Sequence, residues 1–236
     1  MNPNLPSLPR LSDYPEYYAN SIPETEAVVF GEQRLNYRDF AGLIDQCAQA
    51  LLVAGVSHGD RVATLSNPHP DALIIWLACA RVGAIWVGLN TRSQYSELAY
   101  IVSDAQPTLL FSIKEFEGRD FHEELKRLYA EFDCVTGIIL FGKSAANEPH
   151  TFEQFLATSH TCDAAIFDNV VKAVSPQAPA LIVYTSGSTG KPKGALLNHQ
   201  SIIASACTQC EYWYPQPLRL LNNLPINHLG GAVQMT

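Results

Sequence analysis

The stretch Leu181–Ala195 reads LIVYTSGSTGKPKGA. Its first part, Leu181–Tyr184, is apolar or aromatic and includes β-branched residues, as buried strands do. From Thr185 onward the chain changes to hydroxyl residues, glycines and two lysines. The change predicts a buried strand that runs directly into an exposed loop able to bind a polar ligand.

The loop carries the groups that hold a polyphosphate. Its glycines permit positive φ and a close approach of the backbone, so that main-chain N–H groups can point at phosphate oxygens. Its hydroxyl groups are further donors, and its lysines can form charge-assisted bonds with phosphate. The residues that we assign to this binding are Thr185, Ser186, Gly187, Ser188, Thr189, Gly190, Lys191 and Lys193.

The loop differs from the P-loop of nucleotide hydrolases, which has the pattern GxxxxGK[ST] and leads into a helix. Here only two residues separate Gly187 from Gly190. Pro192 also disfavours the helical conformation at Lys191. A solvated hairpin that binds no ligand is the simpler alternative, and these residues alone leave it open.

The charge around the loop contrasts with the charge of the whole chain. The formal net charge is -8, yet between Asp168 and Glu211 the chain carries Lys172, Lys191 and Lys193 and no acid. A small cationic region in an acidic protein favours one small anionic ligand over a nucleic acid.

The composition is that of a globular protein. With 236 residues, 47% hydrophobic and 16% charged, the chain can form one large or two small domains. The segment Met1–Tyr18 is proline-rich and polar, unlike a secretory signal, so we expect a cytoplasmic protein. The six cysteines lie mostly in apolar patterns and are expected to be reduced. Cys207 and Cys210 lie in a helical pattern without a second pair, and we expect no metal ligands in the chain.

The apolar stretch Ala72–Leu89 is nearly long enough to cross a bilayer. Arg81 lies near its centre, where a charge costs roughly 2.5–3.5 kcal/mol, and Gly83 divides the stretch further. We therefore predict a buried helix followed by a buried strand, and no membrane span.

Strand and helix patterns alternate along the chain after an initial hairpin at Ala27–Phe30 and Gln33–Leu35. The predicted strands are Val62–Leu65, Ile85–Leu89, Thr108–Phe111 and Gly137–Phe141. The predicted helices are one from the cap Asn36 to Gly55, Pro70–Arg81, Ser93–Val102 and His122–Ala130. The alternation predicts an α/β fold whose mainly parallel sheet is covered by helices on both faces.

Residues 142–179 are less regular, with a short helical pattern around Phe155. We predict that they connect two subdomains. The division is then a first α/β subdomain at 1–141, the connecting region at 142–179, and the start of a second α/β subdomain, with the loop, at 180–236. After the loop we predict a helix capped by Asn198 and a strand at Leu220–Pro225.

The string from Ile182 to Lys193 resembles the phosphate-loop signature of the adenylate-forming (AMP-binding) superfamily, which includes acyl-CoA synthetases, peptide-synthetase adenylation domains and firefly-luciferase-like enzymes. Three further stretches resemble motifs of this superfamily and extend the likeness over most of the chain: Leu35–Phe40, Leu77–Asn90 and Leu224–Gly231. The resemblance implies the N-terminal part of the large adenylate-forming domain, with layered, mainly parallel sheets covered by helices.

Gly88 and Thr91 stand where the superfamily usually has prolines. We interpret these as turn positions that bind nothing, so the departure leaves the expected chemistry intact. His199 also matches a recurrent position just after the loop, and we interpret it as a structural or helix-start residue.

The resemblance implies that a carboxylic acid attacks the α-phosphate of ATP, with Mg²⁺ bridging the phosphates, and that the acyl group then passes to coenzyme A. His228 follows a predicted strand end, where ligands gather in α/β sheets. By the resemblance it lies beside the activated carboxylate as a catalytic residue. Amino-acid-activating members hold the substrate amine with an aspartate, but Leu224–Gly231 contains no acid, so a fatty or aryl acid is expected.

Later motifs of the superfamily are missing from the chain: a Y-G-x-T-E stretch for adenine and metal, a T-G-D aspartate for the ribose, and the C-terminal domain with its lysine. We therefore expect this chain to be the N-terminal fragment of an acyl-CoA synthetase, and to be inactive alone. The alternative is a non-catalytic module of the same fold that binds a nucleotide or an acyl group.

Overall fold

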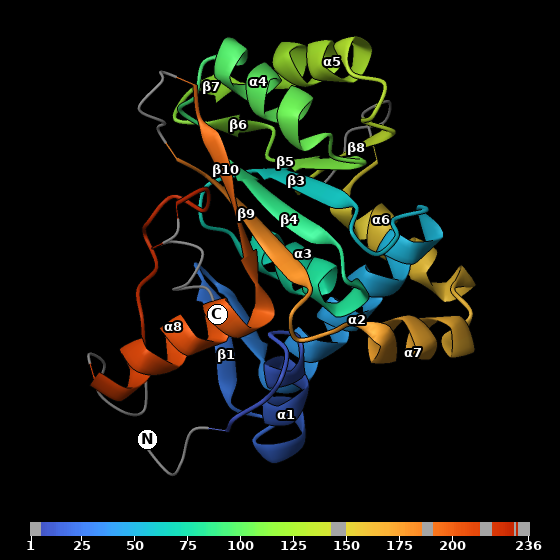
Figure 1. The fold of residues 1–236 in the computed structure, drawn as a ribbon, viewed down its shortest axis with the longest axis vertical. Helices are drawn as coiled ribbons and strands as arrows, with labels where there is room; N and C mark the ends of the chain where they lie inside the picture. Colours follow the sequence, from blue (N-terminus) through green and yellow to red (C-terminus); the bar gives the residue numbers. More distant parts are fainter. Residues whose placement is uncertain (1–5, 143–149, 186–190, 213–218, 229, 231–236) are drawn as a thin grey trace.

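The computed structural model describes residues 6–142, 150–185, 191–212, 219–228 and 230. Within these residues the chain forms a six-stranded sheet with helices on both faces (Figure 1). The strand order is β10-β9-β4-β3-β5-β8. The predicted α/β class with a mainly parallel sheet is confirmed.

Five strands of this sheet run parallel to one another: β3 (Arg61–Leu65), β4 (Ile85–Leu89), β5 (Leu109–Ser112), β8 (Gly137–Leu140) and β9 (Pro179–Thr185). The sixth, β10 (Lys193–Asn198), is antiparallel to β9 and lies at one edge. Every residue of β4 and of β5 is buried. Strands covered on both faces are mostly apolar for this reason.

Helices α4 (Tyr95–Ala105) and α5 (His122–Glu131) cover one face of the sheet, and α2 (Tyr37–Val53) and α3 (Pro70–Val82) cover the other (Figure 1). Three shorter helices pack against the layer formed by α2 and α3. Helices α1 (Asp13–Ser21) and α6 (Phe152–Ala157) contact α2, and α7 (Ala164–Ala173) contacts α3. The sheet is therefore the middle of three layers.

Local signals explain where α2 begins and where α3 ends. Asn36 Oδ1 accepts a hydrogen bond from the Asp39 N–H over 2.8 Å, which caps the start of α2 as predicted. Gly83 has a φ of 77° and ends α3 in the left-handed conformation that favours glycine. Between α3 and the sheet, the rings of Trp76 and Trp86 stack with centroids 5.4 Å apart.

The remaining elements lie outside this sheet. The predicted hairpin is present as β1 (Glu26–Phe30) and β2 (Gln33–Asn36). Helix α8 (His199–Tyr212) starts after Asn198, whose Oδ1 accepts a hydrogen bond from the Ser201 N–H over 2.8 Å. The smallest pieces are β6 (Glu115–Phe116), β7 (Arg119–Asp120) and the 3₁₀ helix η1 (Thr158–Thr161).

The predicted strand at Leu220–Pro225 is wrong. These residues form no strand, and the side chain of Leu221 is 84% exposed. The antiparallel β10, which was not predicted, follows the loop instead and takes the edge position beside β9. Helices α1 and α7 were not predicted either, and α7 lies in the region expected to be a connection.

The sheet includes strands from both sides of residues 142–179, because β9 pairs with β4 at Trp86↔Leu181 and Val87↔Ile182. The division into two subdomains stays a prediction. The apolar stretch 72–89 forms α3 and β4, and no described helix is long and apolar enough to cross a membrane.

Candidate functional site

The candidate site lies where β4 and β9 end. Because these neighbouring strands are parallel, their last residues, Leu89 and Thr185, lie at the same edge of the sheet. In α/β sheets, ligands bind at this carboxyl edge. The chain returns from there as β10, beside β9 (Figure 1). In this pair Lys193 lies opposite Thr185. The base of the predicted phosphate loop is therefore a strand pair at the carboxyl edge of the sheet.

The structure brings three of the predicted phosphate-binding residues together at this base. The hydroxyl of Thr185 lies 3.5 Å from the carbonyl oxygen of Lys193 and donates to it. The side chains of Lys191 and Lys193 are exposed. The other predicted residues of the loop lie outside the described part of the chain: Ser186, Gly187, Ser188, Thr189 and Gly190.

Helix α4 contacts both arms of the loop, the outgoing one at Tyr184 and the returning one at Pro192. No sequence pattern indicated these contacts. The Tyr100 hydroxyl donates a hydrogen bond to the Pro192 carbonyl over 3.0 Å, and the Lys191 ammonium lies 5.8 Å from the centre of the Tyr100 ring. On the other arm, the Tyr184 hydroxyl donates to Asp104 Oδ2 over 2.6 Å. Burial, and then the Asp104 carboxylate, raise the pKa of Tyr184, so its hydroxyl keeps the proton that it donates.

His228 lies in a turn that also reaches this edge. The His228 N–H donates to the Pro225 carbonyl over 3.1 Å, and Nδ1 accepts from the Gly230 N–H over 3.1 Å. Because Nδ1 accepts, the neutral ring carries its proton on Nε2. The side chain is exposed, and among the described residues Nε2 has no hydrogen-bond partner. The ring can therefore donate a hydrogen bond to an anionic ligand.

The turn is held against β4 at Gly88. A Cβ at position 88 would lie 2.9 Å from Asn227 Cα and 2.9 Å from the Ile226 carbonyl oxygen. Gly88 lies within the strand, paired with Thr64, so its interpretation as a turn position is wrong. Thr91 does lie in the turn that follows β4.

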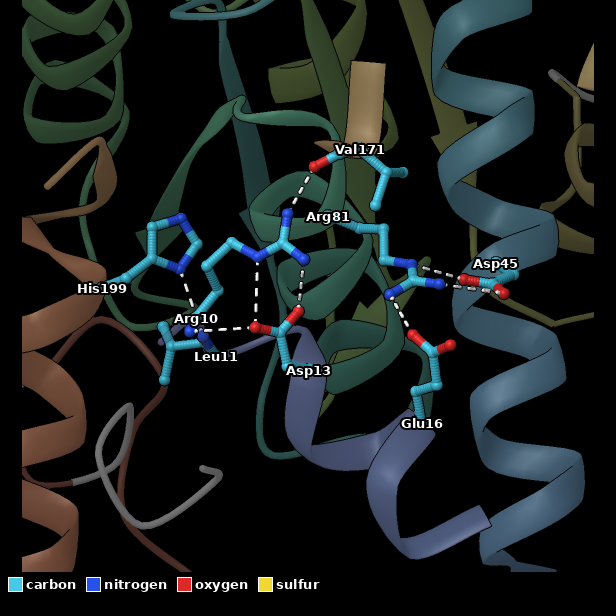
Figure 2. Close-up of polar contacts among 8 residues, drawn as sticks. All are labelled: Arg10, Leu11, Asp13, Glu16, Asp45, Arg81, Val171 and His199. Atoms are coloured by element: carbon cyan, nitrogen blue, oxygen red, sulfur yellow. Dashed lines mark hydrogen bonds and ion pairs between the residues drawn. The ribbon is translucent and has the colours of Figure 1, made fainter. Parts of the chain in front are cut away.

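His199 has a structural position at the start of α8 (Figure 2). Its side chain is fully buried, and its Nδ1 accepts a hydrogen bond from the Leu11 N–H over 3.2 Å. Burial, and then the Arg10 guanidinium, lower the pKa of His199 to about 4. Arg10 is held by an ion pair with Asp13 at 2.7 Å and by a hydrogen bond to the Val171 carbonyl. The neutral imidazole thus ties the N-terminal segment to the helix that follows the loop.

A second cluster in Figure 2 joins three helices, none of which carries a residue assigned to the candidate site. The guanidinium of Arg81 in α3 forms ion pairs with Glu16 of α1 at 2.8 Å and with Asp45 of α2 at 2.7 Å. Burial raises the pKa of Asp45, while Arg81 opposes the shift. This cluster fixes the packing of the helices.

The chemistry of the donor set fits a polyphosphate. The described residues at the loop base supply one hydroxyl and two ammonium groups, and none of them is acidic. Among the described residues there is no group of three or more His, Cys, Asp or Glu side chains that could hold a metal ion. The hydroxyl and ammonium groups at the loop base can bind phosphate oxygens directly. A magnesium ion at this base would take its ligands from the phosphates and from water.

The family described as AMP-binding enzyme matches residues 16–236. Among curated proteins, the chain is 33% identical over 228 residues to an indoleacetate–CoA ligase of Aromatoleum aromaticum, covering 96% of this chain and 42% of that protein. It is 28% identical over 200 residues to a 3-hydroxybenzoate–CoA/4-hydroxybenzoate–CoA ligase of Thauera aromatica, covering 84% of this chain and 36% of that protein. The chain thus spans less than half the length of these two relatives.

Among solved structures, the chain is similar to a putative long-chain-fatty-acid CoA ligase of Rhodopseudomonas palustris. The TM-score is 0.78 at 22% identity, and the match covers 96% of this chain and 54% of that one. It is also similar to the N-terminal domain of FACL13 from Mycobacterium tuberculosis, with a TM-score of 0.74 at 21% identity over 96% of this chain and 53% of that one. These likenesses confirm the predicted fold.

Proposed function

The chain belongs to the family of AMP-binding enzymes, and from that premise we propose that the whole protein activates a carboxylic acid with ATP and transfers it to coenzyme A. In the first step a carboxylate oxygen attacks the α-phosphorus of ATP, the bond to the β-phosphate oxygen breaks, and pyrophosphate leaves. In the second step a thiol sulfur attacks the acyl carbon, AMP leaves, and the thiol proton passes to water. The products are an acyl thioester, AMP and pyrophosphate.

One observation carries this proposal. The parallel pairing of β4 and β9 supports a single site in which Thr185, Lys193 and the turn with His228 converge on one edge of the sheet. A loop that stabilises departing pyrophosphate must lie within one substrate length of the carboxylate that displaces it. The ends of neighbouring parallel strands lie side by side, which supports such an arrangement at the ends of β4 and β9.

Each residue then has a definite task. Thr185, Lys191 and Lys193 bind the β- and γ-phosphates and stabilise the charge that develops on pyrophosphate as it leaves. Magnesium, when bound, neutralises part of the same charge. His228 donates from Nε2 to an oxygen of the acid, which orients the carboxylate toward the α-phosphorus. The remaining loop residues, 186–190, supply backbone N–H groups to the phosphates in this proposal.

We infer that the acid is an aryl or fatty acid. The stretch Leu224–Gly231 has no acidic side chain to hold a substrate amine. Relatives with 33% and 28% identity are named for indoleacetate and for hydroxybenzoates, which supports testing aryl acids first. We place the reaction in the cytoplasm, because all six cysteines are free thiols, as is usual in a reducing compartment.

The test is acid-dependent exchange of labelled pyrophosphate into ATP by the complete gene product. We expect exchange with at least one acid from a panel of indoleacetate, hydroxybenzoates and fatty acids of graded length, and acyl-CoA formation once coenzyme A is added. A protein that binds ATP but gives no exchange with any acid would instead be the non-catalytic module. Pyrophosphate exchange without acyl-CoA formation would support adenylation of the acid but exclude coenzyme A as the acyl acceptor.

A further inference from the structure

Gly88 is a glycine in the middle of a central strand, where the backbone conformation does not require one. It lies in β4, pairs with Thr64 of β3, is buried, and has no positive φ. Any residue can adopt an extended strand conformation, and glycine weakens a strand because it has no side chain to pack. The reason for glycine must therefore be the space around it.

That space is filled by the turn that carries His228. A Cβ at position 88 would lie 2.9 Å from Asn227 Cα, 2.9 Å from the Ile226 carbonyl oxygen and 3.0 Å from Trp86 Cη2. Cβ atoms in proteins essentially never lie under 3.0 Å from other heavy atoms, as the Cβ would from the two backbone atoms of the turn. Two of the three atoms belong to the backbone of the turn, so no rotation of a side chain removes the conflict.

The sheet side of this contact is rigid. Trp86 stacks on Trp76, and its Nε1–H donates to the Thr64 hydroxyl over 2.8 Å in the buried core. The turn lies outside the sheet, and the side chain of Ile226, which is 1% exposed, anchors it. We therefore expect the turn to be the part that moves. A side chain at position 88 therefore displaces the turn and leaves the strand in place.

We propose that Gly88 is a positioning residue for the acid: the missing side chain lets the turn 225–228 lie directly on β4 and sets the depth of His228 at the sheet edge. This inference rests on the proposed function for its effect on the reaction. The β9–β10 hairpin contributes none of the three atoms nearest to position 88. A change at Gly88 thus affects the acid side of the site and spares the phosphate side.

The first experiment compares Gly88→Ala with Gly42→Ala in the complete gene product. Gly42 is a matched control, because a Cβ there has open space around it and no positive φ opposes it. We expect Gly88→Ala to raise the KM for the acid about tenfold and to change the KM for ATP less than about twofold. Gly42→Ala should change neither. An unchanged KM for the acid in Gly88→Ala, or an equal rise for acid and ATP, would overturn the proposal.

The second experiment needs no activity. Hydrogen exchange of the peptide that covers residues 224–230 should be faster in Gly88→Ala than in the wild type, and unchanged in Gly42→Ala. Equal exchange in all three proteins would refute the packing argument, even if no acid proves to be a substrate. If the wild type activates no acid but hydrogen exchange is faster in Gly88→Ala as expected, only the proposed function is refuted.

Ile226→Ala provides the same test if Gly88→Ala does not fold. It releases the turn from its anchor and leaves β4 unchanged. We expect the same selective rise in the KM for the acid and the same faster exchange of residues 224–230. If hydrogen exchange of residues 224–230 and the KM for the acid in this variant equal those of the wild type, the position of the turn does not depend on its packing. That result would contradict the proposal.

Discussion

The hydroxyl of Tyr100 donates a hydrogen bond to the carbonyl oxygen of Pro192, 3.0 Å away. Pro192 stands between the two lysines of the predicted phosphate loop, so α4 holds the returning arm of that loop at the point where its charges are placed. Tyr184 and Asp104 make the corresponding contact on the outgoing arm. The loop base is thus fixed to a helix that contributes no proposed ligand of its own.

Tyr100→Phe should weaken ATP binding without unfolding the protein. The substitution keeps the ring near Lys191 but removes one hydrogen bond, which is worth about 1 kcal/mol. We expect a roughly fivefold higher KM for ATP and an unchanged KM for the acid, measured by pyrophosphate exchange. Tyr129→Phe is the control, because the Tyr129 side chain is exposed and has no hydrogen-bond partner among the described residues. Equal ATP kinetics in both variants would show that the contact has no role in nucleotide binding.

Lys193→Met should slow adenylation by about tenfold or more. The ammonium of Lys193 is proposed to stabilise pyrophosphate as it leaves, and interactions that strengthen in the transition state act on the rate. Lys126→Met is the control, because Lys126 is an exposed lysine of α5, on a different element from the loop. The measurement is single-turnover formation of the acyl adenylate. A wild-type rate in Lys193→Met would show that this loop lysine does not stabilise the transition state of adenylation.

The buried His199 should make folding stability depend on pH. Burial lowers its pKa to about 4, while an unfolded chain has a histidine pKa of about 6.5. Between these values the unfolded state takes up a proton that the folded state does not, so stability falls as the pH falls from 6.5 toward 4. His199→Asn keeps an acceptor for the Leu11 N–H and cannot be protonated.

The expected result is therefore a difference between two proteins. The free energy of unfolding of the wild type, minus that of His199→Asn, should fall by about 2 kcal/mol between pH 7 and pH 5. Urea unfolding at several pH values measures it, and the comparison cancels the contributions of the other titrating groups. A difference that stays constant over this range would show that His199 is accessible to protons in the folded state.

Arg81→Met should destabilise the helical layer. The substitution keeps the apolar stem but leaves Glu16 and Asp45 without their cation, and hydrogen bonds to charged groups contribute roughly 1.5–3 kcal/mol. We expect a loss of about 2 kcal/mol in urea unfolding. Arg34→Met is the matched control, because its ion pair with Glu26 is exposed and worth less than about 1 kcal/mol. Similar losses in the two variants would mean that burial does not strengthen the Arg81 pairs.

Several elements could be predicted from short stretches because their signals are local. Asn36 caps α2, Gly83 ends α3, and the continuous apolar run of β4 indicates a strand covered on both faces. Helix α7 also has such a signal, although residues 142–179 were predicted to be a connecting region. Asp163 caps it, accepting from the N–H groups of Ala165 and Ile166.

Two stretches near the C-terminal end of the described chain could not be assigned correctly from local signals. The run Leu220–Pro225 contains three leucines, which suggested a strand, but also two asparagines. Among the described residues it pairs with no strand, and its leucines are exposed. The stretch Lys193–Asn198 carries a glycine and polar ends, yet it becomes β10 because β9 offers a free edge. Strand pairing depends on which edges remain open after folding, so composition alone cannot decide it.

The sequence by itself determined the α/β class and the family, because these depend on residue types and on their spacing along the chain. It also predicts the polyphosphate chemistry of the loop after β9. Only the tertiary structure decided that Tyr100 and Asp104 hold the two arms of that loop, and that the backbone of Ile226 and Asn227 occupies the space which Gly88 leaves open. The physical reason is that these contacts join residues remote in sequence. They are made by strand order and by steric fit between layers, and no local pattern encodes either.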